Sequence, residues 1–242
     1  VFMKKKANVR DLVEVIMNGV FFLMGMTAIA FVALITVYMF VSGLPAIAKI
    51  GPVDFLLGRT WASTAAQPSY GILPFILTSF FGTLGAVLIG IPVGLLTSVF
   101  LSKIASPRMA AVVSSAVELL AGIPSVIYGL IGMVVLVPAV ASVFGLASGA
   151  CMLTAILVLA VMILPSIISV SVTALNAVPK EYEEASLALG ATKIETYFKV
   201  SLPAAKSGIA AGIVLGVGRA IGEAMAVMMV AGNSPNMPDS LF

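Results

Sequence analysis

One stretch of the sequence differs sharply from the rest: Pro179-Lys-Glu-Tyr-Glu-Glu-Ala-Ser-Leu-Ala-Leu-Gly-Ala-Thr-Lys-Ile-Glu-Thr-Tyr-Phe-Lys-Val-Ser-Leu-Pro203. This polar loop (residues 179–203) is the longest charge-bearing run in a chain that is otherwise almost continuously apolar. Pro179 suits the first turn of a helix, and Gly190 can take the left-handed conformation that ends one. Thr192 and Glu195 have the spacing of a capping box, which predicts a second helix. We therefore expect two short helices bent around Gly190, between two membrane spans and available for contact with another protein.

The overall composition is that of a protein embedded in a membrane. Of the 242 residues, 61% are hydrophobic and 10% are charged, whereas soluble domains carry about 25% charged residues. The sequence has no histidine, which excludes His-based catalysis and His metal ligands, and its single Cys151 cannot form an internal disulfide. It also lacks a Gly-x-x-x-x-Gly-Lys-Ser/Thr phosphate loop, so this chain cannot hydrolyse ATP by that route. We expect an all-α polytopic membrane protein that is not an enzyme and holds neither metal nor cofactor.

Five apolar segments are long enough to cross a bilayer, and we expect spans at about 15–41, 74–101, 109–140, 151–175 and 204–231. The first is too long for a cleaved signal peptide and is expected to be retained. The third is interrupted at Gly122-Ile-Pro124 and the fourth should kink near Pro165. Residues 42–70 form an extracytoplasmic segment, in which Trp61 and Phe55 suit the lipid interface.

The basic residues predict the orientation of these spans. Ten Lys and Arg residues lie at the N-terminus, in the turn after the second span, and in or beside the polar loop, against two on the opposite side, Lys49 and Arg59. The N-terminal group comprises Lys4, Lys5, Lys6 and Arg10. By the positive-inside rule, the N-terminus and the polar loop are cytoplasmic. Five spans then leave the C-terminus outside.

Three charged residues lie well inside predicted spans: Glu118, Arg219 and Glu223. Each costs about 2.5–3.5 kcal/mol at the centre of an isolated helix. With about 100° of rotation per residue along the fifth span, a single narrow helix face carries both of its charges and three small residues, Gly208, Gly212 and Gly216. That face must pack against another helix or line a water-filled path. Two interpretations remain open. Either Arg219 and Glu223 neutralise each other, or Arg219 attracts an anion while Glu223 holds Arg219 in place and keeps the site from trapping the anion.

Part of the polar loop resembles a known family. Glu184-Ala185-Ser186, Gly190 and Val200-x-Leu202-Pro203 resemble the "EAA" loop of ABC-importer permeases, with Ser186 in place of a second alanine and Val200 in place of isoleucine. The resemblance implies a type I ABC-importer transmembrane domain whose loop couples to a cytoplasmic ATPase. The coupling residues would be Glu184, Ala185, Ser186, Gly190, Leu202 and Pro203.

This resemblance also implies a division of the chain. Residues 71–242 would form the permease core, and residues 1–70 the basic cluster, first helix and extracytoplasmic segment. Because the family closes with a further helix that returns inward, we expect this chain to lack its final helix.

Two further segments resemble the PstC type of phosphate-importer permease: Glu118-Leu-Leu-Ala-Gly-Ile-Pro-Ser-Val-Ile-Tyr-Gly129 and Gly218-Arg-Ala-Ile-Gly-Glu-Ala-Met-Ala-Val-Met-Met-Val-Ala-Gly-Asn233. The likeness runs from about residue 70 to residue 233, with Ala224 departing from an expected threonine. It implies a membrane-spanning subunit of an ATP-driven importer of inorganic phosphate, in the cytoplasmic (inner) membrane of a prokaryote. Arg219, Glu223 and Glu118 would lie along the substrate pathway.

The same resemblance implies the partners of the chain. They are a second homologous permease subunit in a heterodimer, a dimer of cytoplasmic ATP-binding subunits, an extracytoplasmic phosphate-binding protein and membrane lipid. ATP hydrolysis belongs to the separate subunit. No nucleic acid is implied, because the basic residues follow membrane topology.

Three alternatives differ in substrate or class. Molybdate and sulfate permeases share the Gly-Arg-x-x-Gly-Glu pattern, so another oxyanion is the first alternative. An ATP-independent channel or secondary transporter would need internal repeats or its own coupling-ion site, and the sequence displays neither. A membrane scaffold without transport would not need Arg219 and Glu223 inside a span.

Overall fold

The computed structural model describes residues 9–241 of a chain that divides into two compact units, Val1–Gly58 and Arg59–Phe242. We describe each unit by itself. Part of the predicted basic cluster lies outside the described residues: Lys4, Lys5 and Lys6.

Unit 1 consists of one long helix, α1 (Val9–Ile50), followed by the short helix α2 (Pro52–Leu57). At about 1.5 Å per residue, α1 extends for about 63 Å, roughly twice the hydrocarbon thickness of a bilayer. The span predicted at 15–41 lies inside it. The helix continues past that span because the following residues stay largely apolar, and it includes Pro45. The chain then turns at Gly51, which has a φ of 98°.

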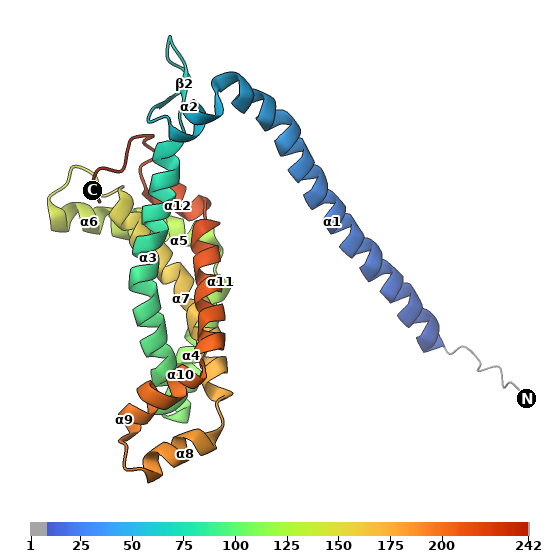
Figure 1. Cartoon of the computed structure of the whole chain (residues 1–242), viewed down its shortest axis with the longest axis vertical. Coiled ribbons are helices and arrows are strands. Elements are labelled where there is room, and N and C mark those ends of the chain that lie inside the picture. Colours follow the sequence, from blue (N-terminus) through green and yellow to red (C-terminus); the bar gives the residue numbers. More distant parts are fainter. Residues whose placement is uncertain (1–8, 242) are drawn as a thin grey trace, which may run out of the picture. The chain divides into compact units, whose positions relative to one another are not determined.

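Unit 2 is a helical bundle with a small β-hairpin at one end (Figure 1). The hairpin pairs β1 (Trp61–Ala62) antiparallel with β2 (Ser69–Tyr70). The ring of Trp61 packs edge-on against Tyr70 and Phe75, with centroids 5.7 and 5.6 Å away. The helices follow in chain order: α3 (Leu73–Val99), α4 (Pro107–Gly122), α5 (Ser125–Ile131), α6 (Val137–Phe144), α7 (Met152–Asn176), α8 (Lys180–Ala188), α9 (Lys193–Thr196), α10 (Leu202–Ala204), α11 (Lys206–Ile221) and α12 (Met225–Val230). Three π-helical turns join some of them: η1 (Phe100–Ile104), η2 (Gly132–Leu136) and η3 (Tyr197–Ser201).

Helix α7 is the centre of unit 2. It packs against α3, α4, α11 and α12, and its Met162 and Ile163 are completely buried. Pro165 lies inside the helix without ending it. The bounds of α7 confirm the fourth predicted span to within one residue at each end.

Glycines of two neighbouring helices make this packing possible. On α3, a Cβ added at Gly90 would lie 2.6 Å from Ile163 Cδ1, and one added at Gly94 would lie 2.8 Å from Ile167 Cγ2. On α11, Gly208, Gly212 and Gly216 face α7 in the same way. Apolar burial drives helix association weakly in lipid, so close backbone approach at small residues matters more there. The predicted glycine face of the fifth span therefore packs against another helix, α7.

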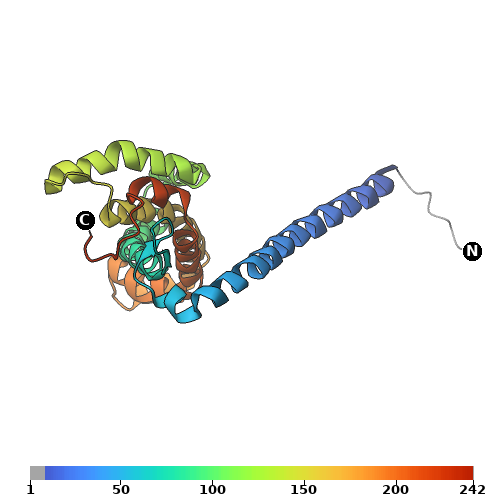
Figure 2. The same ribbon diagram turned by 90° about the horizontal axis from the view of Figure 1, so that it is seen from above.

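The third predicted span is divided between helices. Helix α4 ends at Gly122 and α5 begins at Ser125, which confirms the predicted interruption. The Tyr128 hydroxyl donates a hydrogen bond to the Leu120 carbonyl at 2.7 Å and so bridges the break. The continuous apolar run long enough to cross a membrane is Ser125–Phe144, through α5, η2 and α6. In the view from above, α4, α5 and α6 lie along one flank of unit 2 (Figure 2).

The fifth predicted span is not one helix. Helix α11 ends at Ile221, and α12 begins only at Met225. The prediction of a continuous helix across 204–231 is wrong, because the chain leaves helical geometry at Gly222, a weak helix former. Among the described residues, four helices are long and apolar enough to cross a membrane. A fifth candidate arises if Lys193–Ala204 and Lys206–Ile221, bent by 73°, count as one span.

Candidate functional site: the polar loop and the intramembrane charges

The polar loop has the predicted helix–glycine–helix form. Helix α8 begins directly after Pro179, and Gly190 takes a φ of 88°. The Thr192 N–H donates to Glu195 Oε2 at 3.1 Å, and the Glu195 N–H donates to Thr192 Oγ1 at 3.3 Å, which is a complete capping box at the start of α9. These bonds satisfy amide groups that a helix start leaves open. The local prediction from sequence is confirmed.

Several side chains of the polar loop are exposed on unit 2. Glu184 and Ala185 are exposed, and Leu189 is 90% exposed. Further large apolar side chains are exposed on α8, α9 and η3: Tyr182, Leu187, Ile194 and Phe198. Apolar groups gathered on an otherwise polar segment are typical of a protein-contact surface.

The remaining predicted loop residues hold the loop together. The Ser186 and Thr196 hydroxyls lie 2.9 Å apart and join α8 to the last residue of α9. Leu202 packs against the apolar cluster that contains Val99 and Leu175. Pro203 lies in the first turn of α10 and is exposed.

A second polar cluster at this loop centres on Glu183. Its Oε1 atom lies 2.5 Å from Lys103 Nζ and accepts a hydrogen bond from Ser201 Oγ at 2.8 Å. The three residues come from α8, η1 and η3, which are far apart in the sequence. The sequence analysis did not pair them. One feature of the sequence could have suggested the pair. Lys103 lies in the short turn after the second predicted span, on the same predicted side of the membrane as the polar loop.

The surroundings of Glu183 keep it ionised. Burial raises its pKa, but hydrogen bonds from Lys103 and Ser201 and the charges of Lys103 and Lys180 together lower the pKa below its ordinary value of 4.5. The carboxylate is therefore charged at neutral pH, and its ion pair with Lys103 is intact.

Arg219 and Glu223 lie on either side of the break between α11 and α12. Arg219 is in the last turn of α11, where the helix dipole favours a cation. Glu223 Oε1 accepts a hydrogen bond from the Ala226 N–H at 2.8 Å, at the start of α12. Among the described residues, no salt bridge joins Arg219 to Glu223. The prediction that both charges occupy one face of a continuous helix is wrong, because the helix ends between them.

The third predicted intramembrane charge, Glu118, stands apart from the other two. It is exposed on α4, beside Leu119, which is 74% exposed. The charge therefore lies on a surface of α4 that unit 2 leaves uncovered.

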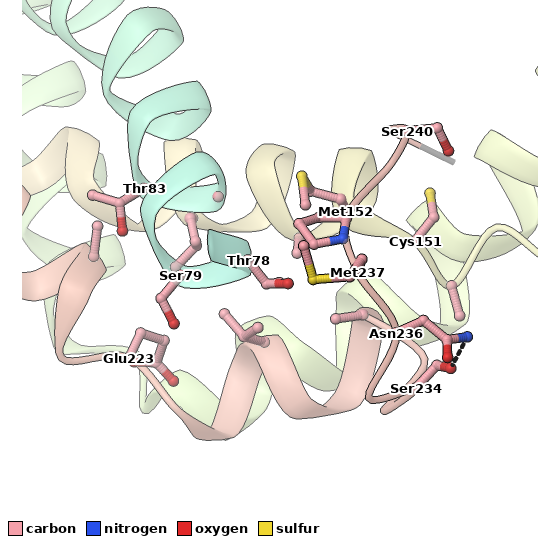
Figure 3. Close-up of a pocket in the computed structure, with 18 of the residues that line it drawn as sticks. Thr78, Ser79, Thr83, Cys151, Met152, Glu223, Ser234, Asn236, Met237 and Ser240 are labelled. Atoms are coloured by element: carbon pink, nitrogen blue, oxygen red, sulfur yellow. Dashed lines mark hydrogen bonds between the residues drawn. The ribbon is translucent and has the colours of Figure 1, made fainter. Parts of the chain in front are cut away.

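A cavity of about 610 Å³ opens near the hairpin end of unit 2, between α3, the start of α7, α12 and the C-terminal tail. Hydroxyl groups of Thr78, Ser79 and Thr83 line it, together with Glu223. Figure 3 shows Ser79 and Glu223 facing the same space. Arg219 and Glu118 are not among the lining residues. Within residues 9–241, no three His, Cys, Asp or Glu side chains gather as a metal site requires.

Comparison with known proteins identifies a family. Residues 90–239, more than half of the chain, match the family described as "Binding-protein-dependent transport system inner membrane component". This segment contains the whole polar loop, Arg219 and Glu223.

Two curated relatives are similar over most of the chain. The "Probable ABC transporter permease protein YqgH" of Bacillus subtilis is 43% identical over 210 residues, covering 86% of this chain and 68% of that protein. The "Phosphate transport system permease protein PstC" of Pasteurella multocida is 38% identical over 212 residues, covering 78% and 64%. The chain thus spans about two thirds of the length of these relatives.

A solved structure has the same arrangement of helices. A chain of the MetNI methionine ABC transporter, in an inward-facing conformation, matches with a TM-score of 0.50 and 26% identity, covering 71% of this chain and 72% of that one. The chain therefore belongs to the family of binding-protein-dependent transport system inner membrane components, with the fold of an ABC-transporter transmembrane domain.

Proposed function

We propose that this chain is a membrane-spanning permease subunit of an ATP-driven importer that carries inorganic phosphate across the cytoplasmic membrane. The observation that carries the proposal is the match to proteins named phosphate transport permease PstC from several bacteria. It reaches 38% identity over 78% of this chain. The PstC-named protein of Xylella fastidiosa is 36% identical over the same share.

The polar loop is the proposed contact with a separate ATP-binding subunit. Its exposed apolar side chains and exposed Glu184 support this role, because the loop lies at the end of unit 2 opposite the hairpin (Figure 1). The proposed assembly also contains a second homologous permease subunit, a dimer of ATP-binding subunits and an extracytoplasmic phosphate-binding protein.

The proposed orientation puts the N-terminus and the polar loop in the cytoplasm. The ten-to-two distribution of Lys and Arg supports it. The ion pair between Lys103 and Glu183 adds a second argument, because it joins the turn after α3 to the polar loop. Both basic segments therefore lie at one end of unit 2, as residues on one side of a membrane must.

The proposed substrate pathway starts at the cavity near the hairpin and passes Arg219. The hydroxyl groups of the cavity can donate hydrogen bonds to an oxyanion. Arg219, in the last turn of α11 before the break, offers a guanidinium that cannot lose its proton and can bind an oxyanion through two hydrogen bonds. Glu223 supplies an opposing charge, which keeps the anion from binding too tightly to leave. We assign Glu118 to the same pathway on a face completed by the partner permease.

The test is transport by the complete importer. The full-length permease, purified with its co-expressed subunits, is reconstituted into proteoliposomes with the binding protein outside and ATP inside. We expect ³²P-phosphate uptake that requires ATP and the binding protein. Uptake without ATP would instead support a channel or secondary transporter.

The substrate is tested by competition. Excess arsenate should compete with phosphate, because the two anions share charge and geometry, whereas sulfate and molybdate should not. Labelled sulfate or molybdate uptake, with none of phosphate, would favour the alternative oxyanion and leave the family assignment unchanged.

A further inference from the structure

A single carboxylate connects α8 of the polar loop to the end of α3 and to η3, the last turn of the loop before α10 and α11. Glu183 Oε1 contacts Lys103 Nζ in η1, the continuation of α3, and Ser201 Oγ in η3, which leads through α10 into α11. Helix α8, which carries Glu183, follows α7 after a short turn at 177–179. One side chain therefore links α8 to the end of α3 and to η3, which precedes α11 in the chain, in addition to the covalent connection of α8 to α7.

Both partners of Glu183 come from π-helical turns. Lys103 lies in η1 and Ser201 closes η3. A π-helical turn changes the direction in which the following side chains point, and such turns are frequent at functional positions. Here the two turns aim one donor each at the same oxygen atom.

The burial of this cluster separates it from an ordinary surface ion pair. The side chains of Lys103 and Glu183 are 12% and 20% exposed, and Ser201 is completely buried. The other ion pair of the polar loop, Lys199 with Glu195, has a separation of 3.3 Å and side chains 75% and 47% exposed. Exposed pairs contribute little, whereas removing one partner of a buried pair leaves a charge without compensation.

We propose that Glu183 is a positioning residue that transmits motion of the polar loop to α3 and α11 as well as to α7. This inference rests on the proposed coupling of the loop to an ATP-binding subunit. Without the cluster, α8 keeps its chain connection to α7 and the contact of Ser186 with Thr196 of α9, but it loses its link to the end of α3. Movement of α8 would then no longer be transmitted directly to α3, and ATP hydrolysis would continue with less transport.

The experiment measures phosphate uptake and ATP hydrolysis in the same proteoliposomes, per assembled complex. We expect Glu183→Gln and Lys103→Met each to lower the ratio of phosphate transported to ATP hydrolysed by about tenfold, within the usual range for coupling between sites. The amount of complex and its hydrolysis should persist. The two changes combined should cost no more than either alone, and the exchange Lys103→Glu with Glu183→Lys should recover part of the ratio.

Matched controls use neighbouring charges outside the cluster. Glu181→Gln removes an exposed acid of the same helix, and Lys199→Met removes the exposed lysine of η3. Both should keep the wild-type ratio. A wild-type ratio in Glu183→Gln, or an equal fall of uptake and hydrolysis, would overturn the proposal, since a merely structural cluster lowers both together.

A second measurement separates this inference from the proposed function. Amide hydrogen exchange of α8 and η1 in the assembled complex should rise in Glu183→Gln and Lys103→Met and stay unchanged in Glu181→Gln. Failure of the wild-type complex to transport phosphate would overturn the proposed function alone. Unchanged exchange in all variants would overturn the cluster's role, whatever the substrate.

Discussion

Two charges four positions apart, Arg219 and Glu223, have different surroundings because α11 ends between them. Arg219 remains on the helix, and Glu223 caps the next one through the Ala226 N–H. Within residues 9–241, no ion pair joins Arg219 to Glu223. This arrangement favours a role in which Arg219 is available to an anion.

The first prediction follows from this difference. Arg219→Gln should abolish phosphate uptake, because the anion loses the fixed charge that offsets its dehydration in a low-dielectric bundle. Arg219→Lys should restore little, because it keeps the charge but loses the planar, bidentate geometry. Labelled phosphate uptake is measured beside the amount of assembled complex, which should stay near wild type.

The double variant is the control for this prediction. Glu223→Gln keeps an acceptor oxygen for the Ala226 N–H and removes only the charge. If the two charges served only each other, Arg219→Gln with Glu223→Gln would recover uptake. Such recovery would exclude Arg219 from the substrate pathway.

A second residue-scale prediction concerns Gly190. Its φ of 88° lies in the left-handed region, and a Cβ placed there would meet no atom within 4 Å. The cost of a side chain is therefore backbone strain, about 1–2 kcal/mol for ordinary residues. Gly190→Val should weaken uptake while the subunit stays in the membrane. Gly190→Asn, which tolerates this conformation, should retain more uptake, and equal uptake in both variants would exclude a need for the left-handed turn.

At the scale of elements, α7 lies between two helices that present glycines to it. Branched side chains such as Ile163 and Ile167 fill the space that these glycines leave. The sequence predicted that the small residues permit close helix approach. It could not predict which helix they approach, because the same spacing suits packing against α7 or against a partner subunit.

The third prediction tests this packing with a matched pair of glycines on α11. A Cβ at Gly208 would overlap the methyl group of Ala174, which cannot move aside, whereas a Cβ at Gly218 would meet nothing within 4 Å. Gly208→Ala should therefore destabilise the bundle by about 1–3 kcal/mol. Gly218→Ala should be neutral or stabilising, because alanine favours a helix. The measurement is the thermal unfolding midpoint of each purified variant. Equal midpoints for Gly208→Ala and Gly218→Ala would contradict close packing at Gly208.

For the molecule as a whole, sequence predicted the features that local chemistry controls. Hydropathy located α7, and the capping box and Gly190 defined the two helices of the polar loop. The break after Ile221 was missed, because Gly222 and Glu223 suit both a helix and its interruption. The ion pair of Lys103 with Glu183 was also missed, because its members are 80 positions apart in the sequence and only the packing of α3 beside α7 brings them together.

The last prediction concerns the orientation of the whole molecule in the membrane. The hairpin precedes α3, and Lys103 follows it and binds Glu183 of the polar loop. The 27 residues of α3 extend about 40 Å, enough to separate the two ends across a bilayer. A cysteine at the exposed Ser63 of the hairpin and one at the exposed Lys193 should therefore lie on opposite sides. In intact cells, an impermeant maleimide should label Ser63→Cys and leave Lys193→Cys unlabelled, because the basic polar loop stays in the cytoplasm.

Two controls make this labelling interpretable. The native Cys151 is only 7% exposed, and its replacement by alanine removes remaining background. Permeabilised cells must then label Lys193→Cys, which shows that the membrane, and not a bound subunit, protected it. Labelling of Lys193→Cys in intact cells with protection of Ser63→Cys would reverse the orientation. The polar loop would then face away from cytoplasmic ATP, and the proposed contact with an ATP-binding subunit would be impossible.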